Sequence, residues 1–128
     1  MRQEPPSPTR HLRVRCERGH TVLEFRGAID IASATEIAPR LDRETRRPGA
    51  RIVLDLGGIE FFDCSGLRLL HRAHGQVLAG GGQAHLVCSH PLTLRMLRIT
   101  GLSRLLPPRR TLQEVLGAAL PPARRTGC

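Results

Sequence analysis

The chain has 128 residues, a length that suits a single domain with its own hydrophobic core. All 20 basic residues are arginine and they outnumber the 11 acidic residues, which gives a formal net charge of +9. Such a surface attracts polyanions. With three Phe, no Tyr and no Trp, however, the chain has little material for base stacking, so we expect no specific nucleic-acid binding.

The sequence also argues against secretion, membrane insertion and metal binding. The first residues lack the apolar core of a signal peptide, and no run of about 18 apolar residues could span a bilayer. The four cysteines are too widely spaced for a zinc knuckle and too few for a disulfide scaffold. We therefore expect a cytoplasmic protein with no cofactor and no metal site.

The first part of the chain predicts a disordered tail followed by a β-hairpin. Residues 1–10 are rich in proline and polar groups, which is typical of disorder. Residues 11–16 and 21–27 alternate apolar and polar side chains, and Gly19 lies in the short connection between them. Two such runs around a tight turn predict an antiparallel pair of strands.

A helix and a central strand are expected next. From Ser33 onward the apolar residues recur at helical spacing, and either Ser33 or Asp30 can cap the helix, which should end near residues 47–49. Residues 51–56 form a nearly continuous apolar run, typical of a strand covered on both faces.

The second half predicts two further helices, with strands between and after them. A helix is expected over residues 65–79, then a strand over 83–89, a helix over 89–101 and a brief strand near 104–106. The expected inward stripe of the first of these helices consists of Leu67, Leu70, His74, Val77 and Leu78.

The chain should end with one more helix and a tail. Residues 111–120 carry a helical stripe, and residues 121–128 should be a disordered tail. Strands that alternate with helices indicate an α/β domain, with a mixed sheet of four to five strands and about four helices.

Ser65 raises the question of chemistry, because it lies in an Asp-Cys-Ser-Gly turn at the start of a helix. A nucleophilic serine needs a base, but the G-x-S-x-G elbow is absent, and His71 and His74 lie about 9 to 14 Å further along the helix axis. The alternative is structural: Asp63 or Ser65 caps the helix and stabilises it by about 1 kcal/mol.

Three segments occur in a characteristic order: FRGAIDIASATEI, IVLDLGGIEFFDCSGLRLL and GGQAHLVCSHPLTLRMLRITGLSRLL. Together they resemble the STAS domain of anti-sigma factor antagonists, with a match from about Arg13 to Leu120. The middle segment, with its Asp-x-Ser-Gly turn, is the most specific. The resemblance implies a single STAS-type domain over residues 11–120.

The resemblance also implies a noncatalytic role in transcription regulation by partner switching. In this family the second hydroxyl position of the turn, here Ser65, is phosphorylated by a partner that is both serine kinase and anti-sigma factor. The unphosphorylated protein would bind this partner and free the sigma factor. The phosphorylated protein would let go until a metal-dependent serine phosphatase restores it. The kinase would supply the catalytic residues, so the chain is not expected to be an enzyme.

A partner-binding surface around Ser65 is implied at Asp30, Asp63, Cys64, Gly66 and Arg68. Asp30 is equally well explained as a cap, and Cys64 as a small packing residue rather than a redox-sensitive thiol. Gly66 would keep the turn slim. Arg68 stands where the family often has a small residue, and it could pair with phosphoserine, face solvent or select the partner.

Other functions stay open at this point. A STAS domain without phosphorylation could serve as a subunit of a lipid transporter or of a signalling assembly. Nucleotide hydrolysis is disfavoured, because the phosphate-binding loop G-x-x-x-x-G-K-[ST] is missing.

Overall fold

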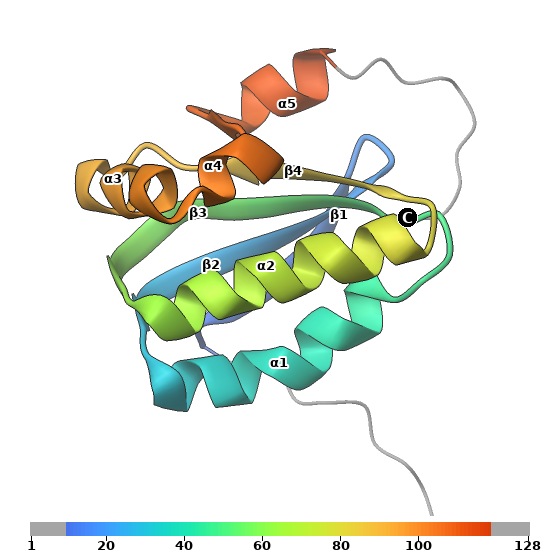
Figure 1. The fold of residues 1–128 in the computed structure, drawn as a ribbon. Helices are drawn as coiled ribbons and strands as arrows, with labels where there is room; N and C mark the ends of the chain where they lie inside the picture. The colour runs from blue at the N-terminus through green and yellow to red at the C-terminus, as the bar shows by residue number, and fades with distance from the viewer. Residues whose placement is uncertain (1–9, 119–128) are drawn as a thin grey trace, which may run out of the picture.

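Five strands and five helices make up residues 10–118, which the structure, a computed structural model, describes (Figure 1). The strands are β1 (Leu12–Glu17), β2 (His20–Ile29), β3 (Arg51–Phe62), β4 (Gln83–Val87) and β5 (Pro108–Arg109). The helices are α1 (Ile31–Thr45), α2 (Cys64–Ala79), α3 (Pro91–Thr100), α4 (Leu102–Leu105) and α5 (Leu112–Ala118). The predicted α/β fold is confirmed.

The strands form one mixed sheet in the order β1-β2-β3-β4-β5. β1 and β2 are antiparallel, as predicted, and their turn places both Arg18 (φ 51°) and Gly19 (φ 79°) in the left-handed region. Two such residues match the twist of the flanking strands. The remaining pairs, from β2 to β5, are parallel, so the carboxyl ends of β2 and β3 lie at the same edge of the sheet.

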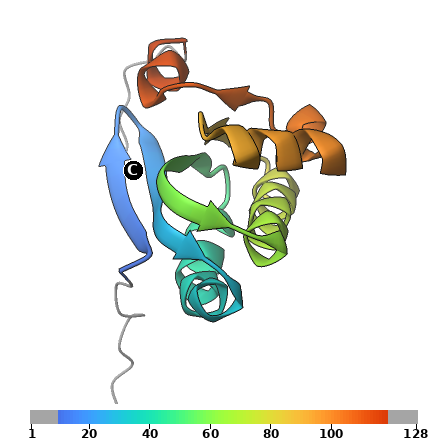
Figure 2. The same cartoon turned by 90° about the vertical axis from the view of Figure 1, so that its left-hand side faces the viewer.

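Helices cover both faces of this sheet (Figures 1 and 2). On one face α1 and α2 pack side by side, and buried residues of α3 and α4 join the same core through Leu97 and Leu102. On the other face α5 contributes Val115, which packs against the valines of β2, β3 and β4: Val22, Val53 and Val87. Alternation along the strands separates the two cores, because successive side chains point to opposite faces.

β3 is longer than predicted and carries the chain to the edge where α2 begins. Its pairing with β2 shifts twice, so two bulges lie in β3 opposite residues 24–26 and 27–28. The first bulge contains Gly57, whose N–H donates to Asp55 Oδ1 at 2.9 Å. The bulges interrupt the apolar pattern, so the pattern predicts a strand that ends near residue 56.

The structure corrects two predictions about the later elements. The brief strand near residues 104–106 is wrong: Gly101, at φ 83°, ends α3, the chain re-enters a helical turn, and β5 forms only at Pro108–Arg109. Leu78 is wrong as a core residue, because 55% of it is exposed. The buried residues of α2 are Gly66, Leu69, Leu70, Ala73 and Val77, so the predicted Leu70 and Val77 are in the core.

The limits of the described region bear on two further expectations. Both predicted tails lie outside the described residues except for residue 10, so the domain boundaries stay predictions. Among residues 10–118, no helix is both long enough and apolar enough to cross a membrane.

Candidate functional site

Two helix starts meet at one edge of the sheet, where β2 and β3 end. Ile29 is the register partner of Phe62, and the next residue of each strand, Asp30 or Asp63, caps the helix that follows. The Asp63 N–H donates to the Ile29 carbonyl at 3.2 Å, which ties the two strand ends together. Parallel pairing therefore brings together two predicted site residues that are far apart in the sequence.

Asp30 forms a complete capping box with Ser33. Its Oδ1 accepts from the Ser33 N–H at 3.0 Å, and the Asp30 N–H donates to Ser33 Oγ at 2.9 Å. The hydrogen bonds from the backbone and then the hydroxyl of Ser33 lower the pKa of Asp30 below its ordinary value. Asp30 rather than Ser33 is therefore the cap, and its exposed carboxylate stays charged at neutral pH.

Asp63 caps α2 and holds the backbone of Ser65. Its Oδ1 accepts from the Ser65 N–H at 2.8 Å, and its carbonyl accepts from the Gly66 and Leu67 N–H groups. Ser65 is thus the second residue of α2 rather than its cap. Its side chain is half-buried, and among residues 10–118 its hydroxyl has no hydrogen-bond partner.

Gly66 is buried against the ring of Phe62. A Cβ at this position would lie 2.6 Å from two carbons of that ring, well inside van der Waals contact. The glycine therefore allows Phe62 to fill the space under the first turn of α2, and this packing positions Ser65. That Gly66 keeps the turn slim for a kinase stays a prediction.

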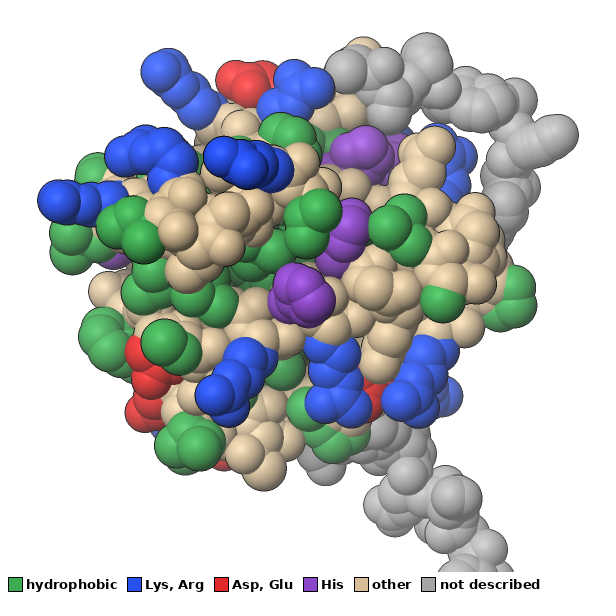
Figure 3. Space-filling view, in the orientation of Figure 1, with side chains coloured by type: hydrophobic (Ala, Val, Ile, Leu, Met, Phe, Trp, Pro, Cys, Tyr) green, Lys and Arg blue, Asp and Glu red, His purple; other side chains and the backbone are tan. Residues whose placement is uncertain are grey.

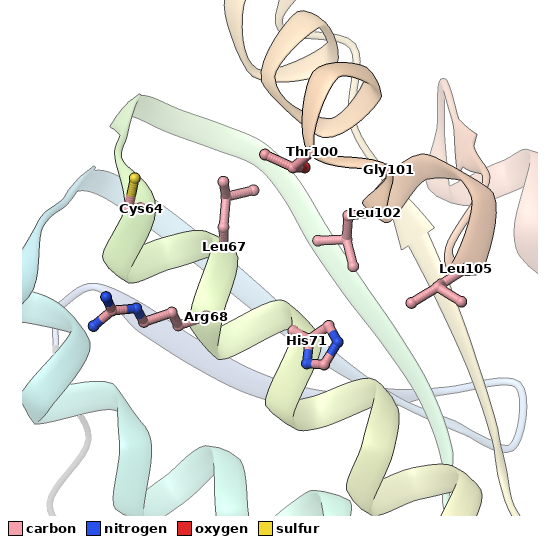
Figure 4. A pocket seen from close by; sticks show the side chains of 8 residues that line it. All are labelled: Cys64, Leu67, Arg68, His71, Thr100, Gly101, Leu102 and Leu105. Atoms are coloured by element: carbon pink, nitrogen blue, oxygen red, sulfur yellow. The ribbon is translucent and has the colours of Figure 1, made fainter.

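Cys64 and Arg68 line an open groove between α2 and the α3–α4 connection (Figure 4). The groove encloses about 410 Å³ and is lined by Cys64, Leu67, Arg68, His71, Thr100, Gly101, Leu102 and Leu105. Leu67 points toward the α3–α4 side, whereas Arg68 extends away from it. Cys64 is an exposed free thiol, and Arg68 makes no hydrogen bond or ion pair with another described residue.

Sequence reasoning missed half of this groove and two apolar side chains near the turn. Thr100–Leu105 were not connected with Ser65, because they lie 35 to 40 positions later in the chain and were expected to include a strand. Ile31, which is 70% exposed, follows Asp30, and Phe61, which is 52% exposed, lies two residues before Asp63. The sequence carried a signal for this exposure in the run Ile-Glu-Phe-Phe. Successive side chains of a strand point to opposite faces, so the two adjacent Phe side chains cannot both be buried on the same face.

Within the described residues, no group of three or more His, Cys, Asp or Glu side chains could hold a metal ion. What the edge presents is a serine hydroxyl, two capping carboxylates and an apolar groove with an arginine at its margin.

The sequence and the fold were compared with known proteins. The STAS domain profile matches residues 11–115, and no curated protein sequence matches significantly. Among solved structures, the chain is similar to an anti-sigma-factor antagonist (STAS) domain protein from Planctomyces limnophilus, with 26% identity and a TM-score of 0.70 over 84% of this chain and 96% of that chain.

Two further structures share the fold. An anti-sigma factor antagonist from Mycobacterium paratuberculosis is 28% identical, with a TM-score of 0.67 over 90% of this chain and 96% of that chain. The phosphorylated form of the Bacillus cell fate determinant SpoIIAA is 19% identical, with a TM-score of 0.66 over 84% of this chain and 97% of that chain. The profile match covers most of the sequence. The chain belongs to the STAS domain family.

Proposed function

We propose that this protein is a noncatalytic anti-sigma factor antagonist that switches partners when Ser65 is phosphorylated. The unmodified protein binds an anti-sigma factor that is also a serine kinase. Phosphorylation releases it, and a serine phosphatase resets it. The observation that carries the proposal is the position of Ser65: a half-buried hydroxyl without a partner among the described residues, in the first turn of α2, at the edge shared with Asp30.

The first turn of α2 is a suitable place for a phosphate. A phosphate adds a charge of about −1.5 to −2, and the dipole of a helix start favours negative charge. The backbone hydrogen bonds of Asp63 hold this turn without using the Ser65 hydroxyl. Modification can therefore leave the fold intact.

Binding should respond strongly to the same phosphate. Asp63 and Asp30 already place two carboxylates at this edge, so a phosphate concentrates negative charge where the partner would dock. A hundredfold rise in the dissociation constant needs about 2.7 kcal/mol, which repulsion and desolvation of a dianion readily supply.

Similar structures support this role. The proteins from Planctomyces limnophilus and Mycobacterium paratuberculosis are anti-sigma factor antagonists, and SpoIIAA is known in an unphosphorylated and a phosphorylated form. The kinase and phosphatase, the cytoplasmic location and the absence of catalysis in this chain are parts of the proposal.

The test identifies the partner and then the modified residue. Immobilised Ser65→Ala and Ser65→Asp proteins are used to recover a partner, which is then prepared as a pure protein. We expect the alanine variant, and not the aspartate variant, to retain a protein kinase. With ATP and magnesium, this kinase should add one phosphate to the wild type, located at Ser65 by tandem mass spectrometry.

Two variants make the result decisive. Ser65→Ala should stay unmodified, whereas Ser89→Ala, which removes an exposed serine outside the site, should be phosphorylated like the wild type. Equal recovery of the partner by alanine and aspartate variants, with no phosphate at Ser65, would instead favour an unphosphorylated STAS subunit of a lipid transporter or signalling assembly.

A further inference from the structure

The groove beside Ser65 has an apolar lining and an open mouth. Leu67 of α2 and Leu102 and Leu105 of α4 are among its lining residues (Figure 4), and Leu105 is 49% exposed. An exposed leucine beside a hollow of about 410 Å³ has the shape of a site for apolar side chains of another molecule.

The helices that border the groove carry charge of one sign. From residue 64 to residue 113 the sequence contains no Asp and no Glu, although it supplies α2, α3 and α4 in full. The same stretch contains seven arginines, which are Arg68, Arg72, Arg95, Arg98, Arg104, Arg109 and Arg110. Every ionised side chain that these three helices contribute at neutral pH is therefore positive.

Most of this positive charge is not neutralised within the described part of the protein. Arg72 pairs with Asp42 of α1, with 2.6 Å between Nη2 and Oδ2, but Arg68 and Arg104 form no ion pair with a described residue. Figure 3 shows arginine side chains over α3 and α4 and again along α1 and α2, with hydrophobic side chains between them. Acidic side chains gather instead where α1 and α2 begin.

The groove is continuous with the surface proposed to bind the partner. Cys64 lines the groove and is the residue before Ser65, so the two surfaces share the first turn of α2. A partner that covers Ser65 would reach the groove without a second, separate interface. The partner segment that complements this region must carry apolar side chains for the leucines and carboxylates for the arginines.

We infer that the groove between α2 and the α3–α4 connection docks an acidic segment with apolar side chains, and that this segment belongs to the anti-sigma partner. This inference rests on the proposed function. Docking then has two parts of opposite charge: the Ser65 edge presents carboxylates to the partner, and Arg68 of the groove and the arginines of the surrounding helices present positive charge. Phosphorylation acts on the first contact and leaves the second unchanged.

The test measures the dissociation constant of the purified partner for groove variants. Leu105 lines the groove and Arg104 is the residue before it in α4; both side chains are exposed, so Arg104→Glu and Leu105→Asp should preserve the fold. We expect each to raise the dissociation constant at least tenfold. The affinity of the wild type should fall from 50 to 300 mM NaCl, and this salt dependence should be weaker for Arg104→Glu.

Arg13→Glu is the matched control. Arg13 is exposed on β1, the strand at the opposite edge of the sheet from β5, and its reversal changes the net charge by the same amount as Arg104→Glu. Its affinity should stay within twofold of the wild type. If Arg13→Glu weakens binding as much as Arg104→Glu, or if both groove variants bind like the wild type, the inference is wrong.

A cross-linking measurement identifies the occupant. A photo-reactive amino acid at position 105 should label an acidic segment of the partner with apolar residues. A label in a second copy of this chain, or in a basic segment of the partner, would overturn the inference.

The inference and the proposed function can fail separately. If Ser65→Asp binds as tightly as the wild type while the dissociation constant of Arg104→Glu rises tenfold, the groove is a docking site but the proposed phosphorylation switch is wrong. If Ser65→Asp loses affinity and the groove variants do not, the switch stands and the groove has no part in it.

Discussion

Gly66 shows how a single residue positions the turn that carries Ser65. The Phe62 ring occupies the space that a side chain at Gly66 would need. Gly66 is also the first buried residue of α2. A glycine inside a helix normally costs stability, so its presence here has a packing reason rather than a conformational one.

Replacing Gly66 with alanine should destabilise the protein by about 1 to 3 kcal/mol, because the new Cβ overlaps the Phe62 ring in a packed core. The matched control is Gly75→Ala in the same helix, where nothing lies within 4 Å of the added Cβ. That variant should gain about 0.5 to 1 kcal/mol. Urea unfolding of both proteins measures the difference, and equal shifts in the same direction would refute the packing argument.

Asp30 should make stability depend on acid pH. The pKa of its carboxyl is lower in the folded protein than its ordinary value of 3.8, because Ser33 donates two hydrogen bonds to it. Its contribution is therefore fully present above pH 3.8 and is lost as the pH falls through the lower, folded pKa. The stability difference between the wild type and Asp30→Asn should shrink from pH 6 to pH 3 in urea unfolding. A difference that stays constant would contradict this account.

At the scale of the elements, the sheet face under α5 contains two histidines in an unfavourable setting. The rings of His20 on β2 and His85 on β4 are 5.8 Å apart between centroids, and the Nε2 atoms of both are buried without a described hydrogen-bond partner. Burial lowers the pKa of both side chains. The nearby Arg51 lowers it further for both, and His20 and Arg109 do so for His85. The folded sheet therefore favours the neutral rings.

This arrangement predicts a loss of stability as the pH falls below about 6.5, the ordinary pKa of histidine. The unfolded chain binds protons there and the folded protein resists them, so the loss grows until the lowered pKa of the folded state is reached. His85→Gln should reduce the loss between pH 7.5 and pH 5.5, measured by urea unfolding. A variant with the same pH dependence as the wild type would show that His85 does not contribute to it.

The elements also show what the sequence alone can predict. The hairpin, α1, α2 and the Asp-x-Ser-Gly turn follow local patterns, so they were predicted close to their observed bounds. The extension of β3 was not, because bulges break the alternation on which strand prediction depends. The groove was not predicted either, because it depends on Gly101 turning the chain so that α4 packs near α2.

At the scale of the whole molecule, the carboxylates are distributed unevenly along the chain. Ten described carboxylates lie before residue 64 or after residue 113, and the helices that build the groove have none. A phosphate at Ser65 would therefore lie between the two capping carboxylates, Asp30 and Asp63, and helices whose charged side chains are all arginines. Net charge alone, +9 for the chain, conceals this division.

The central claim is that phosphorylation of Ser65 changes binding and not folding. The most direct measurement compares the purified unmodified and singly phosphorylated proteins in binding to the same kinase partner by calorimetry, with circular dichroism and urea unfolding of each. We predict a dissociation constant about a hundredfold higher for the phosphorylated protein, or about 2.7 kcal/mol, with unchanged spectra. Equal affinities, or a phosphorylated protein that is unfolded, would contradict the account.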